Sequence, residues 1–147
     1  MTHAPTDPIV VYTDGACSGN PGPSGLGVVM RIDGEERELS EYLGEGTNNI
    51  AELTAILRAL CAIDDTHRPV TLYTDSQYAI GVLTKQWKAK ANQALILQIK
   101  EVLSRFSRCT LHYVRGHNGD PLNERADELA VQAVQNRASQ VWTSRSD

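Results

Sequence analysis

Apolar residues in the first third of the chain follow the two-residue period of β-strands. Residues 9–16 are predicted to form a strand, and the Gly- and Pro-rich residues 17–24 a turn. Two further strands are predicted over residues 26–32 and 37–43, on either side of Asp33-Gly34, a dipeptide that favours a two-residue hairpin. The three strands are therefore expected to form an antiparallel meander.

Helical periodicity begins after the third predicted strand. Apolar residues recur every three or four positions from Ile50 to Leu60, which predicts a helix that is capped by Asn48 or Asn49 and ends near Ile63. The rest of the pattern predicts a strand over residues 70–74, helices over 76–83 and 92–106, a strand over 109–114 and a last helix over 122–136. A helix between the third and fourth strands implies a crossover. The predicted fold class is therefore α/β, a five-stranded mixed sheet with helices on both faces.

Length and composition predict one domain over residues 9–137. The chain has 147 residues, of which 41% are hydrophobic, enough for one ordinary core. Residues 1–8 are polar, lack the pattern of a signal peptide and are predicted to be flexible, and residues 138–147 are predicted to be a polar, frayed tail. Since no apolar run approaches the ~18 residues of a membrane span, we expect a cytoplasmic protein without a membrane partner.

Net charge and cysteine content argue against two kinds of binding site. The net charge of −4 argues against binding nucleic acid by bulk positive charge, so such a role would need local basic groups and bound cations. The three cysteines, Cys17, Cys61 and Cys109, are an odd number without CxxC spacing, which argues against a zinc site. Cys61 and Cys109 fit small core residues, and a single disulfide stays open.

Two predicted strands end in an acid at the same relative place, within the strings YTDG (residues 12–15) and YTDS (residues 73–76). Aspartate is depleted in strands, and a buried carboxylate is costly unless it is paired or bound to a metal. The repetition predicts that Asp14 and Asp75 converge at one end of the sheet, where they would bind Mg²⁺ or Mn²⁺. Taken singly, each could instead cap a turn.

Two more acids lie at the edges of predicted apolar helix faces. Glu52 precedes Leu53 near the start of its helix, and Asp127 follows Ala126, so either could face the end of the sheet. Four such carboxylates could hold two metal ions about 3.5–4 Å apart, an arrangement suited to in-line phosphoryl displacement. The alternatives are a helix-dipole role for Glu52 and an exposed position for Asp127.

Two loops add candidate residues. The string RGHNG (residues 115–119) offers the imidazole of His117 for handling protons or displacing a metal ion at product release. The string CSGNPG (residues 17–22) offers backbone N–H groups and the amide of Asn20 to a sugar or base edge.

Four motifs together resemble the type 1 ribonuclease H family: TDGACSGNPG (residues 13–22), TNNIAEL (47–53), TDSQY (74–78) and VRGHNGDPLNERADELA (114–130). They occur in the family's order and span nearly the whole chain. The resemblance implies the ribonuclease H-like fold. It also implies Mg²⁺-dependent endonucleolytic cleavage of the RNA strand of RNA–DNA hybrids, which leaves 3′-hydroxyl and 5′-phosphate ends.

The resemblance also implies roles for individual residues. It makes Asp14, Glu52, Asp75 and Asp127 the metal-binding catalytic acids and His117 the flexible-loop histidine. The substrate contacts that it implies are Gly15, Cys17, Asn20, Thr47, Asn48, Asn49 and Gln77. It further implies two Mg²⁺ ions per site with substrate, Mn²⁺ as a substitute, an RNA–DNA hybrid as partner, and a monomer without an obligate protein partner.

One departure from the family is the region after the TDSQY motif. Many bacterial members carry a long basic, Trp-rich protrusion there, whereas this chain has only KQWKAK (residues 85–90). Trp87 either packs down as part of an amphipathic face or contacts the DNA strand of the hybrid.

Two other functions stay open. The first is a DNA-processing nuclease such as a resolvase or transposase core, against which the TNN and GNPG strings argue, because they suit a reader of the RNA 2′-hydroxyl. The second is a catalytically inactive hybrid-binding module, against which the intact set of four acids argues.

Overall fold

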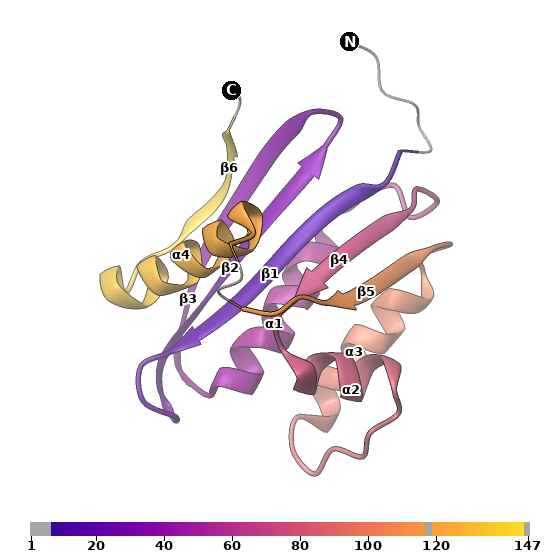
Figure 1. Cartoon of the computed structure of the whole chain (residues 1–147). Helices are drawn as coiled ribbons and strands as arrows, with labels where there is room; N and C mark the ends of the chain where they lie inside the picture. Colours follow the sequence, from indigo (N-terminus) through magenta and orange to yellow (C-terminus); the bar gives the residue numbers. More distant parts are fainter. Residues whose placement is uncertain (1–6, 117–118, 146–147) are drawn as a thin grey trace.

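Six strands form one mixed sheet in the order β5-β4-β1-β2-β3-β6 (Figure 1). The computed structural model describes residues 7–116 and 119–145. The strands are β1 (Ile9–Cys17), β2 (Gly22–Ile32), β3 (Glu35–Gly46), β4 (Val70–Thr74), β5 (Cys109–Tyr113) and β6 (Gln140–Arg145). β1, β2 and β3 form the predicted antiparallel meander, while β4 pairs in parallel with β1 and with β5. The prediction of a mixed α/β sheet is confirmed.

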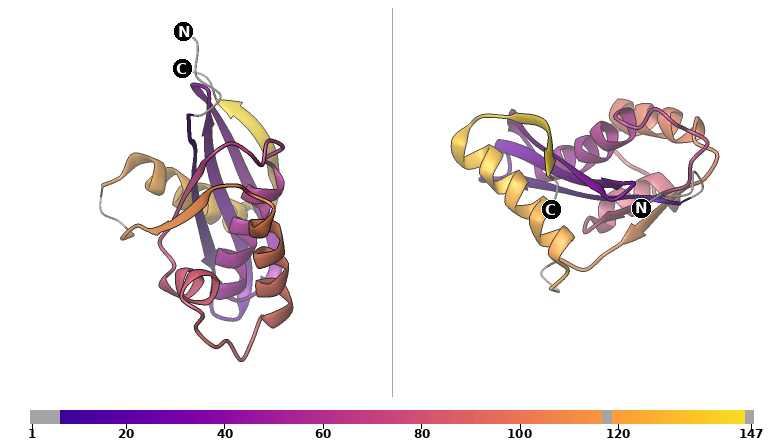
Figure 2. Two further views of the ribbon diagram at one scale, coloured as in Figure 1. Left: turned by 90° about the vertical axis from the view of Figure 1, so that its right-hand side faces the viewer. Right: turned by 90° about the horizontal axis from the view of Figure 1, so that it is seen from above.

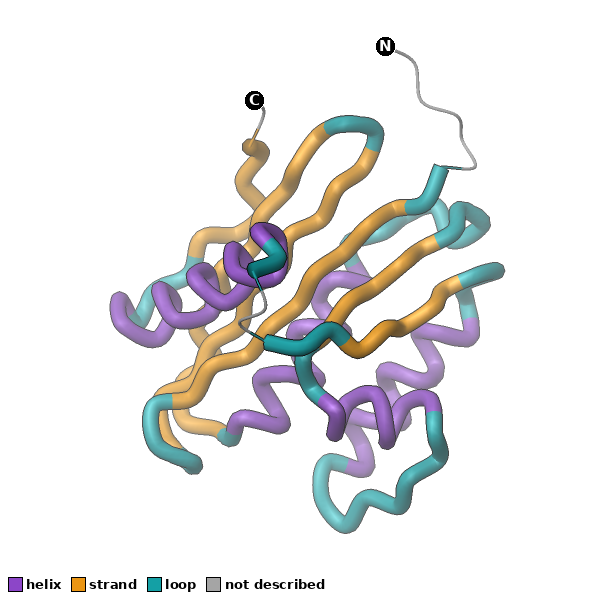
Figure 3. The backbone as a smooth tube through the Cα atoms, viewed as in Figure 1, coloured by secondary structure: helices purple, strands orange, loops and turns teal. Residues whose placement is uncertain are grey.

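Helices cover both faces of the sheet. They are α1 (Asn48–Cys61), α2 (Gln77–Thr84), α3 (Gln93–Ser104) and α4 (Pro121–Asn136). The side views in Figure 2 place α4 on one face and α1 and α3 on the other, and Figure 3 shows the same layers as a backbone tube. The main core lies between the sheet and α1 and α3, around fully buried residues such as Val11, Leu53 and Ile99, and a smaller cluster of Val29, Ala126 and Leu129 lies under α4.

Local signals explain where most elements begin and end. Asp33 and Gly34 have φ angles of 53° and 80°, as the predicted hairpin requires. The N-cap of α1 is Thr47, whose side chain accepts a hydrogen bond from the N–H of Ile50, so the prediction of Asn48 or Asn49 is wrong. Thr47 prevails because its backbone is extended, as a cap residue requires, whereas α1 already begins at Asn48.

The strand count corrects the prediction of five strands. Residues 140–145, expected to belong to a frayed tail, form β6 and pair antiparallel with β3. The pairing satisfies backbone groups on an edge of β3 that would otherwise stay open, and Trp142 packs against the main core. Because the segment is mostly polar, its sequence did not predict a strand.

The cysteines are free thiols in the structure. Cys61 is exposed at the end of α1, so the expectation of a core position is wrong for this residue. Cys109 is half-buried, and burial raises the pKa of its thiol to about 11. Among the described residues, no helix is both long and apolar enough to cross a membrane.

Candidate active site

Asp14 and Asp75 lie side by side at the point where the parallel pairing of β1 with β4 ends. The register pairs Thr13 of β1 with Thr74 of β4, and each acid follows its threonine directly. The N–H of Gly15 donates a hydrogen bond of 2.8 Å to Oδ1 of Asp14, which orients that carboxylate. The structure therefore brings the two acids together, as the repeated string predicts, although β1 continues past Asp14 to Cys17.

Glu52 joins them because α1 packs unusually close to β1. A Cβ atom at Gly15 would lie 2.6 Å from the backbone nitrogen of Glu52 and 2.9 Å from Cβ of Ala51, so only glycine fits at this contact. Glu52 is 5% exposed and lies well inside α1 rather than in its first turn. One carboxylate oxygen from each of Asp14, Glu52 and Asp75 lies within 4.8 Å of the other two.

Asp127 approaches the same cluster from the opposite face of the sheet. A Cβ atom at Gly27, which pairs with Asp14 in the β1–β2 register, would lie 2.1 Å from the carbonyl oxygen of Ala126. This close packing places α4 over the strand next to Asp14. Asp127 is only half-buried and stands outside the three-residue group, but it lies near enough to Asp14 to affect its ionisation.

The buried acids disfavour one another's ionisation. Burial, followed by the charge of Asp75, raises the pKa of Asp14 from its ordinary 3.8 to about 8, while an interaction with Glu52 lowers it and a weaker one with Asp127 raises it. Burial and the charges of Asp14 and Asp75 also raise the pKa of Glu52 well above its ordinary range. A bound cation would remove this penalty.

The donor set fits a hard divalent cation. All the candidate ligands are carboxylate oxygens, which Mg²⁺ and Mn²⁺ favour. Buried Oε1 of Glu52 and buried Oδ1 of Asp75 have no hydrogen-bond partner among the described residues. Since buried polar atoms are normally satisfied, these oxygens are suited to coordinate an ion directly or through water.

The predicted substrate contacts lie at the end of β1, in the following turn and at the starts of α1 and α2. Oδ1 of Asn20 accepts a hydrogen bond of 3.1 Å from the N–H of Asn48, which ties the GNPG loop to the start of α1. Asn20, Asn48, Asn49 and Gln77 are exposed, whereas Thr47 is half-buried. The thiol of Cys17 is 3.4 Å from the carbonyl oxygen of Gly46 and holds the β1 end against β3.

Trp87 packs on α2 and remains partly accessible. A Cβ atom at Gly81 would lie 2.0 Å from the indole ring, so the ring rests on the backbone of α2 at that residue. Trp87 is nevertheless 51% exposed and lines a cavity together with Gln77, Lys85 and Tyr113. The ring therefore packs down on its own helix and still presents a surface. His117, the remaining predicted catalytic residue, lies outside the described residues.

Sequence reasoning missed three polar residues near the acids. Asn123 of α4 is 3% exposed, and its Oδ1 has no hydrogen-bond partner among the described residues. Its place three residues before Ala126, in the apolar stripe of the helix, is the signal that could have identified it. The other two residues are Tyr12 and Asp120, and the Tyr12 hydroxyl donates a hydrogen bond of 2.9 Å to the Asp120 carboxylate. Burial and this bond raise the pKa of Tyr12, which keeps the phenol protonated.

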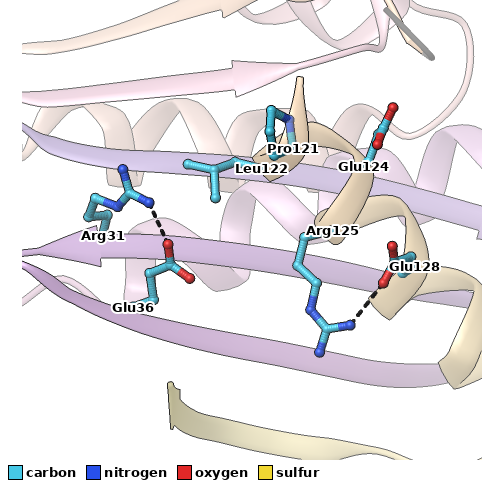
Figure 4. Close-up of a pocket in the computed structure, with 7 residues that line it drawn as sticks. All are labelled: Arg31, Glu36, Pro121, Leu122, Glu124, Arg125 and Glu128. Atoms are coloured by element: carbon cyan, nitrogen blue, oxygen red, sulfur yellow. Dashed lines mark hydrogen bonds and ion pairs between the residues drawn. The ribbon is translucent and has the colours of Figure 1, made fainter. Parts of the chain in front are cut away.

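A separate cleft of about 470 Å³ lies between α4 and strands β2 and β3 (Figure 4). The pairs Arg31–Glu36 and Arg125–Glu128 lie across it. Arg125 also donates two hydrogen bonds, of 2.8 and 2.9 Å, to the buried carboxylate of Glu38. Most charged side chains that line the cleft are thus paired with one another, and the clustered acids are not among them.

Comparison with known proteins gives a consistent family. The sequence profile described as RNase H matches residues 6–135. The chain is 42% identical to the ribonuclease H of Agrobacterium fabrum, over 85% of this chain and 93% of that protein. It is 41% identical to the ribonuclease H of Chlorobium luteolum, over 88% of this chain and 97% of that protein.

Solved structures agree with the sequence relatives. RNase H1 from the halophilic archaeon Halobacterium salinarum superposes with a TM-score of 0.74 at 31% identity, covering 90% of this chain and all of that one (100%). LC11-RNase H1, solved in complex with an RNA/DNA hybrid, superposes with a TM-score of 0.72 at 28% identity, covering 88% of this chain and 98% of that one.

Proposed function

We propose, because this chain belongs to the ribonuclease H family, that its clustered acids are the catalytic and metal-binding residues of a hybrid nuclease. These acids are Asp14, Glu52, Asp75 and Asp127. The enzyme is a metal-dependent endonuclease that hydrolyses the RNA strand of RNA–DNA hybrids. The observation that supports the assignment of the acids is the convergence of the buried Asp14 and Glu52 with the half-buried Asp75 within 4.8 Å, where Oε1 of Glu52 and Oδ1 of Asp75 have no hydrogen-bond partner among the described residues.

The cofactor that we propose is Mg²⁺, two ions per site with substrate, with Mn²⁺ as a functional substitute. When bound, such ions activate the attacking water and stabilise the leaving oxygen of the phosphodiester, which gives 3′-hydroxyl and 5′-phosphate ends. The protein's part is to hold the ligands in place. Gly15 orients Asp14 through its N–H, and the close packing at Gly15 and Gly27 brings α1 and α4 to the strand end.

For hybrid recognition we propose contacts from the loop and helix ends around the acids. Gly15, Cys17, Asn20, Asn48, Asn49 and Gln77 would face the minor groove, where the 2′-hydroxyl distinguishes RNA from DNA. The Thr47 hydroxyl accepts from Ile50 and still has its own proton to donate to a DNA-strand phosphate. The half-exposed ring of Trp87 would contact the DNA strand while resting on α2.

The remaining parts of the proposal come from the family resemblance. His117 would handle protons or assist product release from its loop. Residues 9–137 would act as one catalytic domain, in a cytoplasmic monomer that needs no obligate protein partner.

The test is cleavage of a labelled RNA strand annealed to DNA, with Mg²⁺ and with EDTA. RNA–RNA and DNA–DNA duplexes and the Asp14→Asn variant are assayed beside it. We expect cutting of the hybrid alone, lost with EDTA and in the variant. If the wild-type protein binds the hybrid but leaves it intact, a binding module is favoured. Cutting of duplex DNA would favour a DNA-processing nuclease. An active Asp14→Asn variant would refute the assignment of the acids.

A further inference from the structure

One carboxylate links the first turn of α4 to the central strand of the site. Oδ2 of Asp120 accepts the hydrogen bond of 2.9 Å from the Tyr12 hydroxyl, across 108 residues of sequence. Oδ1 of the same side chain accepts from the backbone N–H of Leu122 at 3.0 Å and of Asn123 at 3.5 Å. Asp120 is thus both the N-cap of α4 and its attachment to β1.

The two ends of this link lie close in sequence to catalytic acids. Tyr12 precedes Asp14 by two positions on β1, so both side chains leave the same face of the sheet. Asp120 precedes Asp127 by seven positions, which is two helical turns on the same side of α4. Figure 1 shows the start of α4 lying across the strands on this face.

A second contact joins Tyr12 to the other metal-binding strand. Its ring stacks on that of Tyr73, with ring centroids 4.7 Å apart and planes 19° from parallel. Tyr73 precedes Asp75 by two positions, in register with Tyr12. Tyr12 therefore contacts both Asp120 and Tyr73, which lie a few residues before Asp127 and Asp75 in the sequence.

We propose that Tyr12 and Asp120 are positioning residues that fix the N-terminal end of α4 over β1 and thereby set the place of Asp127 relative to Asp14. This inference rests on the proposed role of Asp127. Two other contacts hold α4 on either side of Asp127: Ala126 packs on Gly27, and the Ser40 hydroxyl donates a hydrogen bond of 2.7 Å to the carbonyl of Leu129. The Tyr12–Asp120 link is a third point of attachment, and it sets the tilt of the helix about the other two. Loss of the Tyr12–Asp120 link would leave α4 docked but its first turns free to shift, and catalysis is sensitive to displacements of about 1 Å.

The experiment uses Tyr12→Phe, Asp120→Ser and the double variant in the full chain. Phenylalanine keeps the ring that stacks on Tyr73, and serine keeps the helix cap but has no second oxygen for the phenol. For each single variant we expect kcat on a hybrid substrate to fall about tenfold with KM within about twofold. Mn²⁺ affinity of the substrate-free protein, measured by electron paramagnetic resonance, should fall about tenfold. The double variant should be no worse than the poorer single variant.

The matched control is Ser139→Ala, which removes a hydroxyl that accepts a hydrogen bond of 2.8 Å from the N–H of Tyr42, beyond the C-terminal end of α4 and 12 residues after Asp127. It should lower the unfolding temperature and leave kcat and Mn²⁺ affinity within about twofold, because it does not affect the first turn. The inference is overturned if Tyr12→Phe and Asp120→Ser keep wild-type kcat and Mn²⁺ affinity, or if their losses multiply in the double variant. Asp127→Asn, assayed in parallel, separates the two proposals. If Asp127→Asn stays active, the assignment of the acids fails. If Asp127→Asn is inactive while Tyr12→Phe and Asp120→Ser keep wild-type activity, only the positioning role fails.

Discussion

Replacing Asp14 by asparagine should abolish cleavage and, in the absence of metal, raise the free energy of unfolding of the protein. The buried carboxyl has a pKa raised from 3.8 to about 8 by burial and by Asp75. Between these two values the folded state keeps the proton that the unfolded state has released. The unfolded state thus binds fewer protons, so the wild-type protein loses stability as pH rises through this interval. Asparagine has the same shape and no such proton to lose.

The size of the effect follows from the width of the interval. Each pH unit between the two pKa values corresponds to about 1.4 kcal/mol in the free energy of unfolding. From pH 5 to pH 8 the stabilisation by Asp14→Asn should therefore grow by up to about 4 kcal/mol. Water that enters the site reduces this figure, so we expect growth of about 1–4 kcal/mol.

The assay is urea unfolding followed by circular dichroism at pH 5, 6.5 and 8 in EDTA. Asp64→Asn, which makes the same charge change at an exposed position, is the control and should show no such growth. A variant that is no more stable than wild type at pH 8, or an advantage that does not increase with pH, would refute the electrostatic reasoning.

Three further results are expected. Mg²⁺ at ten times its dissociation constant should stabilise the wild-type protein at pH 8 by about 1.4 kcal/mol, or ~4 °C in Tm, with no shift in Asp14→Asn; equal shifts in a thermal melt would place the ion elsewhere. His117→Ala should slow hybrid turnover without abolishing it, because the imidazole assists and does not hold the metal; a folded but wholly inactive variant in the cleavage assay would contradict this. Gly81→Ala should displace the Trp87 ring from α2 and move the tryptophan emission to longer wavelength, whereas an unchanged spectrum would show that the ring is accommodated.

The fold was predictable where sequence periodicity reports burial on one face. The β1–β2–β3 meander and the crossover through α1 follow from alternation, a hairpin dipeptide and an apolar helical stripe. β6 was not predictable in this way, because an edge strand buries little and only Trp142 of its residues packs against the core. Cys61 was misplaced because it lies on the solvent side of the last turn of α1, next to the buried Ala59 and Leu60.

The site was predictable to the extent that it uses local sequence. The acids that follow the apolar strand residues stand out because aspartate is uncommon in strands, and the structure brings Asp14 and Asp75 together as expected. The Tyr12–Asp120 bond has no such signal, since its partners are 108 residues apart and each is ordinary in its own segment. Contacts of this kind depend on how α4 crosses the sheet, which periodicity does not specify.

The glycines show how the fold maintains an unfavourable set of charges. Carboxylates that raise one another's pKa would separate if the elements carrying them could move apart. At Gly15 and Gly27 the missing side chains let α1 and α4 pack directly on the backbone, so apolar burial along both helices holds Glu52 and Asp127 beside β1. The free energy of the core thus opposes the repulsion in the metal-free state. A cation bound by these acids would relieve that repulsion, so ion binding, stability and pH should be coupled through Asp14.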